Sequence, residues 1–424
     1  MKMSFDLVIV GAGPAGLAAA SAAADAGMRI ALVDDNARAG GQVWRQGPAG
    51  AVPDALRDTL AYLASRPNVV HYAGASVSAM TGPCEMIVDV RGEGGLSISL
   101  GRLIIATGAR ERMLPFAGWT LPGVTGAGGL QALIKGGMPV RGERIVLAGS
   151  GPLLVAAWAT ARTAGARVVA IAEQASRRAL WQFGLSLGAT PSKAWQAFRL
   201  TRGFVGTPYW ADSVVREALG DHHVEAVVVR RGRREVTVEC DRIACGYGLV
   251  PNVSLAQALE CVLADGAIEV DHLQRTSVPG VWAAGECTGI GGMELARAEG
   301  EIAGLAAAGL PVPVRVVRER DRWRRFARRV ARSFELGERA REWPSAGTIL
   351  CRCEDVPFGE VATHGTWRDA KLHTRCGMGP CQGRVCGAAA QTYFGWESAA
   401  PRPPFLPTRI GALMEAQQRG DARL

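Results

Sequence analysis

Residues 5–34 constrain the possible folds of this chain more than any other stretch. They read FDLVIVGAGPAGLAAASAAADAGMRIALVD. An apolar run leads into a glycine-rich turn, an alanine-rich helical run follows, and a second apolar run ends at Asp34. A strand, a glycine turn, a helix, a strand and an acid in this order are typical of a dinucleotide-binding unit of the Rossmann type. The sequence therefore predicts an α/β fold with parallel strands.

The glycine turn suits a pyrophosphate for separate physical reasons. Gly11 permits a tight turn, Gly13 lets the backbone approach a ligand closely, and Gly16 lets the helix pack on the strand. The helix N-terminus offers unpaired N–H groups and a positive dipole end, and the acid can accept hydrogen bonds from an adenosine ribose. A purely structural turn is the alternative. The predicted contacts are Gly11, Ala12, Gly13, Pro14, Ala15, Gly16 and Asp34.

Residues 145–174 repeat this pattern. They contain a strand, a turn of sequence Gly-Ser-Gly at residues 149–151, a helix, a strand and an acid at Glu173. The third glycine is replaced by Leu154, which either pushes the helix away from the strand or leaves less room at the phosphates. For this second unit, a nucleotide site and a scaffold without a ligand are both open.

Four further stretches occur at positions that contact the flavin dinucleotide in flavoproteins with two nucleotide-binding domains. They are the loop Gly-Gly-Gln at 40–42, a strand over 72–80, a strand over 103–110 that contains Ala-Thr-Gly, and a Gly-Glu pair after the strand 281–284. The acid of that pair would bond the ribityl chain, and the N-terminus of a helix over 293–308 would stabilise the reduced ring. The predicted contacts are Gly41, Gln42, Val77, Ala106, Thr107, Gly108, Gly285, Glu286 and Gly292.

Length and charge limit the class of protein. The chain has 424 residues, too many for one core, and is 48% hydrophobic. Its net charge of +9 comes without a nucleic-acid recognition motif, so we predict no nucleic-acid partner. The longest apolar run, 145–161, is interrupted by Gly-Ser-Gly-Pro, so we predict no transmembrane segment. The first strand starts too close to Met1 for a targeting peptide, which predicts a cytoplasmic protein.

Three segments suggest surfaces for partners. Residues 315–342 are predicted as a basic helix with one apolar stripe, which suits packing, docking to a partner subunit, or attachment to the inner face of an anionic membrane. Residues 177–209 are rich in Trp, Phe, Leu and basic residues and are predicted as a helical insertion over an interface. The proline-rich residues 401–407 are predicted to lie extended.

Five of the ten cysteines lie between Cys351 and Cys386. In a chain without a secretion signal, such a cluster favours a metal over disulfides. The pairs Cys351/Cys353 and Cys381/Cys386 would supply four thiolates, two per iron, for a [2Fe–2S] cluster. Glycines in the second motif would let backbone N–H groups bond the sulfurs. Zinc held by four thiolates is the alternative, for which Cys-x-Cys spacing is unusual.

With these motifs the chain resembles the flavin- and iron–sulfur-bearing subunit of bacterial multi-subunit amino-acid dehydrogenases. This group includes hydrogen cyanide synthase, the opine oxidases, and the D-hydroxyproline and proline dehydrogenase complexes. The most specific parts of the resemblance are CRCED and GMGPCQGRVC. Related domains lack a cysteine at the position of Cys376, so the resemblance implies that Cys351, Cys353, Cys381 and Cys386 bind the metal.

The resemblance implies an electron-transfer subunit that contains FAD and a [2Fe–2S] cluster. A partner flavoprotein subunit of the D-amino-acid-oxidase type would remove hydride from an amino or imino acid, and a small ferredoxin-like subunit is a further candidate partner. No residue of this chain is predicted to be catalytic. The alternatives are a free-standing NAD(P)H-dependent FAD/iron–sulfur reductase that uses the second Rossmann unit, and a non-enzymatic binding or iron-handling module.

The expected fold is α/β, with two Rossmann-like nucleotide-binding domains and a small α-rich C-terminal [2Fe–2S] domain. We predict an FAD-binding domain in two parts (1–118 and 269–310), an inserted second Rossmann-like domain (119–268), a basic helical linker (311–344), the [2Fe–2S] domain (345–395) and an extended tail (396–424).

Overall fold

The computed structural model describes residues 3–47, 52–82, 84–201, 206–397 and 400–421, with side chains described as far as residue 416. The chain divides into two compact units. Unit 1 contains residues 1–110, 251–327 and 400–424, and unit 2 contains residues 111–250 and 328–399. The chain passes between the units at β7 (Ala109–Glu111) and β16 (Leu249–Pro251), which pair with each other.

Unit 1 is built on a seven-stranded sheet with the order β3-β2-β1-β6-β5-β4, and β19 also pairs with β6. β1 is parallel to β2 and β6, whereas β5 and β4 continue the sheet in antiparallel fashion. Val8 enters one apolar core and Leu7 and Ile9 enter another, so both faces of the sheet are covered. The strands are β1 (Met3–Val10), β2 (Ile30–Asp34), β3 (Val69–Ala73), β4 (Ala75–Gly82), β5 (Glu85–Val90), β6 (Gly94–Ile105) and β19 (Val281–Ala283).

The predicted single strand over 72–80 is divided in the structure. Gly74, with φ +64°, separates β3 from β4, and β4 then turns to pair with β5 instead of continuing beside β2. The left-handed conformation at this position favours glycine, which has no Cβ to clash with the backbone.

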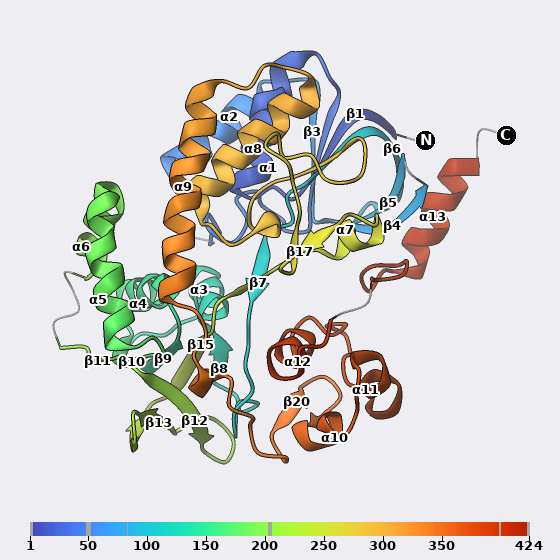
Figure 1. The fold of residues 1–424 in the computed structure, drawn as a ribbon. Helices are drawn as coiled ribbons and strands as arrows, with labels where there is room; N and C mark the ends of the chain where they lie inside the picture. The colour runs from blue at the N-terminus through green and yellow to red at the C-terminus, as the bar shows by residue number, and fades with distance from the viewer. Residues whose placement is uncertain (1–2, 48–51, 83, 202–205, 398–399, 422–424) are drawn as a thin grey trace. The chain divides into compact units, whose positions relative to one another are not determined.

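Two helices of unit 1 pack at very short range, as Figure 1 shows for α1 (Pro14–Ala23) and α8 (Met293–Ala308). Cβ atoms built on Gly300 and Gly304 would overlap the carbonyl oxygens of Ala15 and Ala19. Two glycines about one turn apart on α8 therefore let the helices approach backbone to backbone, which places Gly300 beside Ala15 in the first glycine turn. The other helices of this unit are α2 (Asp54–Ala64) and α7 (Ser254–Ala258).

The C-terminal tail corrects one prediction. The chain runs without regular structure as far as Arg409, and the N–H of Phe405 donates to the carbonyl of Ser78 (2.7 Å). Residues 410–421, expected to be extended, instead form the helix α13 (Ile410–Asp421). Its sequence lacks proline, and its backbone lies directly on Gly95, where a Cβ would overlap the carbonyl oxygen of Ala412.

An ion pair holds this tail to β5, and we expect acid to release it. The guanidinium of Arg409 bonds the carboxylate of Asp89 and the carbonyl of Val90, and these hydrogen bonds hold the pKa of Asp89 below its usual value. A lowered carboxyl pKa contributes stability above the ordinary pKa of aspartate, and that contribution is lost as the pH falls through the lowered value.

Limited proteolysis measures this effect. Cleavage between residues 395 and 410 should accelerate at low pH, and Arg409→Ala should show the accelerated rate already at pH 7. Equal cleavage of the variant and the wild type at pH 7 would show that the ion pair does not hold the tail. Arg57→Ala is the control, because its ion pair with Asp54 joins neighbouring exposed residues within α2.

Unit 2 contains a second Rossmann-type sheet of five strands with the order β11-β10-β9-β15-β8, and a separate three-stranded sheet β12-β13-β14. The predicted repeat at 145–174 is confirmed as strand, turn, helix and strand. The strands are β8 (Val124–Gly126), β9 (Arg144–Gly149), β10 (Arg167–Glu173), β11 (Tyr209–Trp210), β12 (Ser213–Leu219), β13 (Ala226–Arg231), β14 (Arg234–Glu239) and β15 (Arg242–Gly246). The helices that accompany the five-stranded sheet are α3 (Ala127–Lys135) and α4 (Pro152–Thr163).

The helical insertion predicted near residue 177 is present as α5 (Arg177–Ser186) and α6 (Pro191–Thr201). Neither helix has a buried residue, and both expose large apolar side chains, namely Trp181, Leu185, Trp195 and Phe198. These helices therefore contribute surface rather than core to unit 2, and their role at an interface stays a prediction.

The basic helix is shorter than its sequence suggested. It was expected over residues 315–342, but α9 (Val314–Ser333) ends at Ser333. The following residues leave the helix because their backbone groups bond to the second glycine turn instead, as described below. The cysteine-rich segment then forms a small body of the strands β20 (Ile349–Cys351) and β21 (Val356–Pro357) and the helices α10 (Phe358–Ala362), α11 (Trp367–Thr374) and α12 (Cys386–Phe394). Among the described residues, no helix has the length and apolar character needed to span a bilayer.

Candidate cofactor sites

The first glycine turn has the geometry that a pyrophosphate site needs. Gly11 has φ +108°, and a Cβ on it would overlap the carbonyl oxygen of Ala106. A Cβ on Gly16 would overlap the carbonyl oxygen of Gly11, so α1 contacts β1 at backbone distance. By contrast, among the described residues beyond its chain neighbours, a Cβ on Gly13 would have only the Cα of Gly41 within 4 Å, at 3.9 Å. The space above Gly13 is therefore open, at the N-terminus of α1, where N–H groups point outward.

Asp34 fastens this turn from the end of β2. Its Oδ2 accepts from the N–H of Ala12 (2.5 Å), and its Oδ1 accepts from the N–H and side-chain amide of Asn36 (2.8 and 2.9 Å). The carboxylate is buried, and Oδ2 keeps a further lone pair. The bond to a ribose that the sequence suggested stays a prediction. Gln42, also expected near the cofactor, is exposed and accepts from Arg45 (3.1 Å).

The Ala-Thr-Gly segment lies directly after β6. The N–H of Ala106 donates to Val10, which continues the sheet to the turn. Thr107 and Asn252 bond each other twice, through the threonine hydroxyl and the asparagine amide (2.7 and 2.9 Å). The N–H of Asn252 also donates to Gly108. These bonds fix the segment beside Gly11. Val77 has a buried side chain and lies next to an irregularity in the pairing of β4 with β5.

Glu299 is a functional candidate that the sequence motifs did not indicate. Its buried carboxylate accepts from the N–H of Gly285 (3.2 Å), from the hydroxyl of Thr288 (3.1 Å) and from the guanidinium of Arg324 (2.9 and 3.1 Å). Burial raises the pKa of this carboxyl, and the Arg324 cation opposes that shift. The Glu299–Arg324 pair thus holds the turn at Gly285. The sequence shows only that Glu299 precedes Gly300 on this helix, and this position gives no sign of a role.

Glu286 follows that turn and lies partly buried. Burial raises the pKa of its carboxyl, and the N–H of Gly292 bonds the carboxylate and opposes the shift. Gly292 has φ +82° and caps the N-terminus of α8. Glu286, Gly292 and the start of α8 are therefore together, as the sequence predicted, although their contact with a ribityl chain is a prediction. Cys287 is buried, and its sulfur bonds backbone carbonyls of Ile105 and Ala284 rather than a second thiol.

The second glycine turn differs from the first because the chain itself covers it. The hydroxyl of Ser150 donates to the carbonyl of Phe334 (3.0 Å), and a Cβ on Gly151 would meet the ring of Phe334 at 3.4 Å. The side-chain amide of Gln174 donates to Ser150 (2.9 Å) and to the carbonyl of Glu335 (2.9 Å), and it accepts from the N–H of Gly337 (2.9 Å). Residues 334–337 therefore lie where a pyrophosphate would approach this turn. We call them the covering segment.

In the second unit, both carboxylate oxygens of the acid Glu173 accept hydrogen bonds. Glu173 has no exposed surface and accepts from the N–H groups of Gly151 (2.8 Å) and Ala175 (2.9 Å) and from the hydroxyl of Tyr209 (3.3 Å). Burial raises the pKa of this carboxyl. Leu154, which replaces the third glycine, is completely buried in the core around α4. Leu154 and Glu173 are thus both packed within unit 2, and a nucleotide at this turn stays a prediction.

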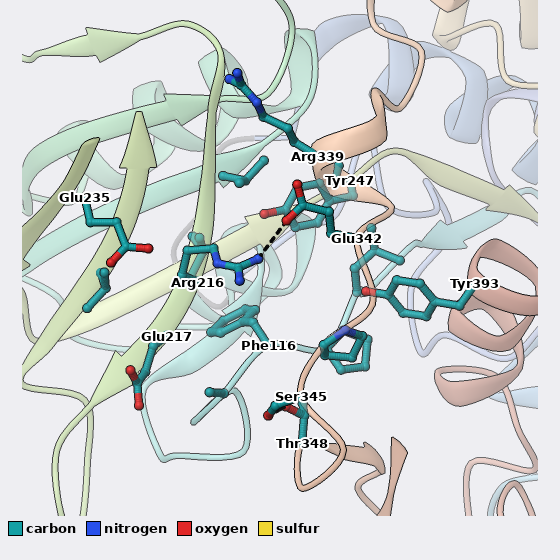
Figure 2. A pocket seen from close by; sticks show the side chains of 18 residues that line it. Phe116, Arg216, Glu217, Glu235, Tyr247, Arg339, Glu342, Ser345, Thr348 and Tyr393 are labelled. Atoms are coloured by element: carbon teal, nitrogen blue, oxygen red, sulfur yellow. Dashed lines mark hydrogen bonds and ion pairs between the residues drawn. The ribbon is translucent and has the colours of Figure 1, made fainter. Parts of the chain in front are cut away.

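A cavity of about 290 Å³ lies elsewhere in unit 2, between β12, residues 339–348 and α12 (Figure 2). Arg216 and Glu342 form an ion pair in it, and Arg230 bonds the same carboxylate. The hydroxyl-bearing rings of Tyr247 and Tyr393 also line it. Its lining includes no residue of either glycine turn and no cysteine. The candidate cofactor sites are therefore separate from this cavity.

The cysteine-rich segment brings five thiols together in two groups. The sulfurs of Cys351, Cys376 and Cys386 all lie within 4.8 Å of one another, and all three residues are buried. Cys353, which is exposed, lies next to Cys381, which is half-buried. From the sequence we predicted the ligand pairs Cys351/Cys353 and Cys381/Cys386, without Cys376. The structure instead places Cys351 beside Cys386, and Cys353 beside Cys381. The proximity of Cys376 had no signal in the sequence beyond the presence of a fifth thiol.

The loop that carries these cysteines is held in an unusual backbone conformation. Arg375, Gly377, Gln382 and Gly383 all have φ between +51° and +79°, which for arginine and glutamine is uncommon. The N–H of Gly377 donates to the sulfur of Cys351 (3.4 Å). Strained backbone of this kind is typical of ligand-binding loops. A metal held by these sulfurs is consistent with that strain.

Comparison with known proteins places these sites in context. Residues 5–301 match the family model described as pyridine nucleotide-disulphide oxidoreductase. An opine oxidase subunit of Rhizobium meliloti (strain 1021) is 33% identical, over 97% of this chain and 98% of that protein. Hydrogen cyanide synthase subunit HcnB of Pseudomonas aeruginosa is 32% identical, over 91% of each.

Solved structures share the fold. The structure of L-proline dehydrogenase from P. horikoshii superimposes with a TM-score of 0.67 at 18% identity, over 97% of this chain and 80% of that one. A thioredoxin reductase of T. acidophilum gives a TM-score of 0.57 at 23% identity, over 73% of this chain and 99% of that one. The α/β fold predicted from the sequence is thus confirmed.

Proposed function

Because the chain belongs to the pyridine nucleotide-disulphide oxidoreductase family, and within it to the group of the opine oxidase and hydrogen cyanide synthase subunits, we propose that it is an electron-transfer subunit of a hetero-oligomeric dehydrogenase. That enzyme oxidises an amino or imino acid such as proline, D-hydroxyproline, an opine or glycine. A partner flavoprotein subunit of the D-amino-acid-oxidase type performs the oxidation, and this chain passes the electrons to an acceptor. A small ferredoxin-like subunit is a second candidate partner.

The contrast between the two glycine turns is the observation that carries this proposal. The first turn leaves the space above Gly13 open, and the second has Phe334 on Gly151. On this proposal unit 1 accepts one dinucleotide, while the ring of Phe334 occupies the space at Gly151 that a second, nicotinamide-bearing dinucleotide would need. This arrangement supports a flavin that is reduced by another subunit rather than by NAD(P)H.

Unit 1 fits FAD as its dinucleotide. The N-terminus of α1 lies at the open space above Gly13 and suits a pyrophosphate, and the buried Asp34 keeps a lone pair for a ribose. The N-terminus of α8, fixed by Glu299 through Gly285, supplies a positive dipole end for the ring. Bound FAD would accept electrons and pass them on, and the chain's own residues would hold and orient it.

Unit 2 fits a [2Fe–2S] cluster. Four thiolates suit two bridged irons, and we assign Cys351, Cys353, Cys381 and Cys386 as ligands. The N–H of Gly377 already bonds a sulfur, a contact that stabilises the reduced state of such clusters. The donor set is all sulfur, so zinc is the competing metal. We assign no catalytic residue, because a protein that only carries electrons between subunits needs no general base for an amine.

The rival function is that of a free-standing NAD(P)H-dependent FAD/iron–sulfur reductase. It gains weight from a benzene 1,2-dioxygenase system ferredoxin–NAD(+) reductase subunit of Pseudomonas putida that is 30% identical over 51% of this chain. We expect NADH and NADPH, mixed anaerobically with the purified protein, to leave the flavin absorbance unchanged, because residues 334–337 cover the second turn. Rapid bleaching of the flavin by either nucleotide would support the reductase instead.

Reconstitution with a partner tests the function itself. The chain should be co-purified with a candidate amine-oxidising flavoprotein subunit, and the complex screened for dye reduction with proline, D-hydroxyproline, glycine and opines. We expect the complex to reduce the dye with one of these compounds and the isolated chain to reduce it with none. Activity of the isolated chain, or a complex inactive with every compound, would contradict the proposal.

A further inference from the structure

Three of the five thiols of the cysteine-rich segment share one buried site. The sulfurs of Cys351, Cys376 and Cys386 lie within 4.8 Å of one another, and no pair among them is singled out by burial, since each residue is buried. An iron of a [2Fe–2S] cluster takes only two protein sulfurs. The buried site therefore holds one thiol more than its iron would need.

We propose that Cys376 is a reserve ligand, which replaces either Cys351 or Cys386 on the buried iron when one of them is lost. The inference rests on the proposed [2Fe–2S] cluster and deepens it. Replacement forms one iron–sulfur bond from Cys376 in place of the missing one. The thiol of Cys376 releases its proton to solvent as that bond forms, and neither iron changes its oxidation state.

The backbone holds Cys376 in position for this exchange. Arg375 before it and Gly377 after it both have positive φ (+64° and +79°), and the N–H of Gly377 donates to the sulfur of Cys351. Arg375 also bonds the carboxylate of Glu354 (2.8 Å), which joins this loop to the Cys-x-Cys motif. These bonds fix the backbone on both sides of Cys376, and its sulfur already lies within 4.8 Å of the sulfurs of Cys351 and Cys386.

Among the described residues, the thiols of Cys353 and Cys381 belong to no such group of three. Cys353 and Cys381 contact each other at the surface, and a Cβ on Gly379 would overlap the Cβ of Cys353, so the backbone closes that side. All ten cysteines lie within the described residues, and the remaining five are outside this segment, at positions 84, 240, 245, 261 and 287. The two ends of the cluster should therefore respond differently to the loss of one ligand.

Single and double alanine variants of the full chain test this asymmetry. Alanine is used because a serine oxygen can itself bind iron. Iron and acid-labile sulfide per chain, the visible absorption and the EPR spectrum of the dithionite-reduced protein are measured after anaerobic purification. We expect Cys351→Ala, Cys386→Ala and Cys376→Ala each to keep most of the iron. Cys353→Ala, Cys381→Ala and the double variants Cys351→Ala/Cys376→Ala and Cys386→Ala/Cys376→Ala should lose most of it.

Each other outcome contradicts the inference. If Cys351→Ala and Cys386→Ala lose as much iron as Cys381→Ala, Cys376 does not replace them. If the single variant Cys376→Ala loses the iron, Cys376 is an obligatory ligand. If both double variants keep the iron, a group other than Cys376 is the replacing ligand. Circular dichroism identifies a misfolded variant. If either Cys351→Ala or Cys386→Ala misfolds, the other still tests the replacement by Cys376. Wild-type protein without iron would instead refute the cluster, and so the proposed function.

Discussion

Substituting alanine for Gly16 is expected to leave the protein without bound flavin. A Cβ at this position would overlap the carbonyl oxygen of Gly11 and lie 2.9 Å from its carbonyl carbon. These are backbone atoms, so no side-chain rotation relieves the clash. Either α1 moves away from β1 or the turn opens, and both changes disperse the N–H groups that face the pyrophosphate. We expect a loss of flavin absorbance and a destabilisation of more than about 3 kcal/mol.

A matched control separates this clash from the general effect of changing a helical glycine. Gly184 lies inside α5 and has no atom within 4 Å of a built Cβ. Gly184→Ala should keep its flavin and gain up to about 1 kcal/mol from helix propensity. Flavin content is measured by absorbance after release from the protein, and stability by denaturant unfolding. Flavin at the wild-type level in Gly16→Ala would show that the first turn is not the binding site.

Replacing Cys381 with alanine should remove the iron and stop electron flow between subunits while FAD stays bound. The two candidate sites belong to different compact units, Cys381 to unit 2 and Gly11–Gly16 to unit 1. Cys381 lies next to Cys353 at the exposed end, and neither belongs to the buried group of three thiols. Each unit has its own apolar cores, so loss of one cofactor should not unfold the other unit.

Cys84→Ala is the control for this prediction, because Cys84 is exposed and belongs to unit 1. It should keep both cofactors. Iron and flavin are measured on the same samples, and electron flow is measured as dye reduction by the reconstituted complex. Simultaneous loss of iron and flavin in Cys381→Ala would contradict the separation of the two sites.

The sequence was sufficient wherever a feature depends on local steric or periodic patterns. The first glycine turn follows from the spacing of Gly11, Gly13 and Gly16, and the repeat at 145–174 follows from the same pattern. Features that depend on long-range contacts could not be inferred in advance. Glu299 pairs with Arg324, and the covering segment bonds Ser150. Cys376 lies beside Cys351. In each case the two residues are distant in sequence.

Two predicted boundaries were wrong, for different reasons. The basic helix should have reached Glu342 by composition, but the backbone beyond Ser333 bonds Ser150 and Gln174. The tail was expected to be extended because of its prolines, yet Ile410–Asp421 forms a helix on Gly95 once the prolines end. Tertiary contacts end the basic helix early, whereas the proline-free segment 410–421 forms a helix in keeping with its local propensity.

Cofactor analysis of the wild-type chain, purified without oxygen, tests the central claim most directly. We predict about two irons and about two acid-labile sulfides per chain, as a [2Fe–2S] cluster requires, together with about one FAD. Zinc in place of iron, or the absence of any metal, would contradict the account.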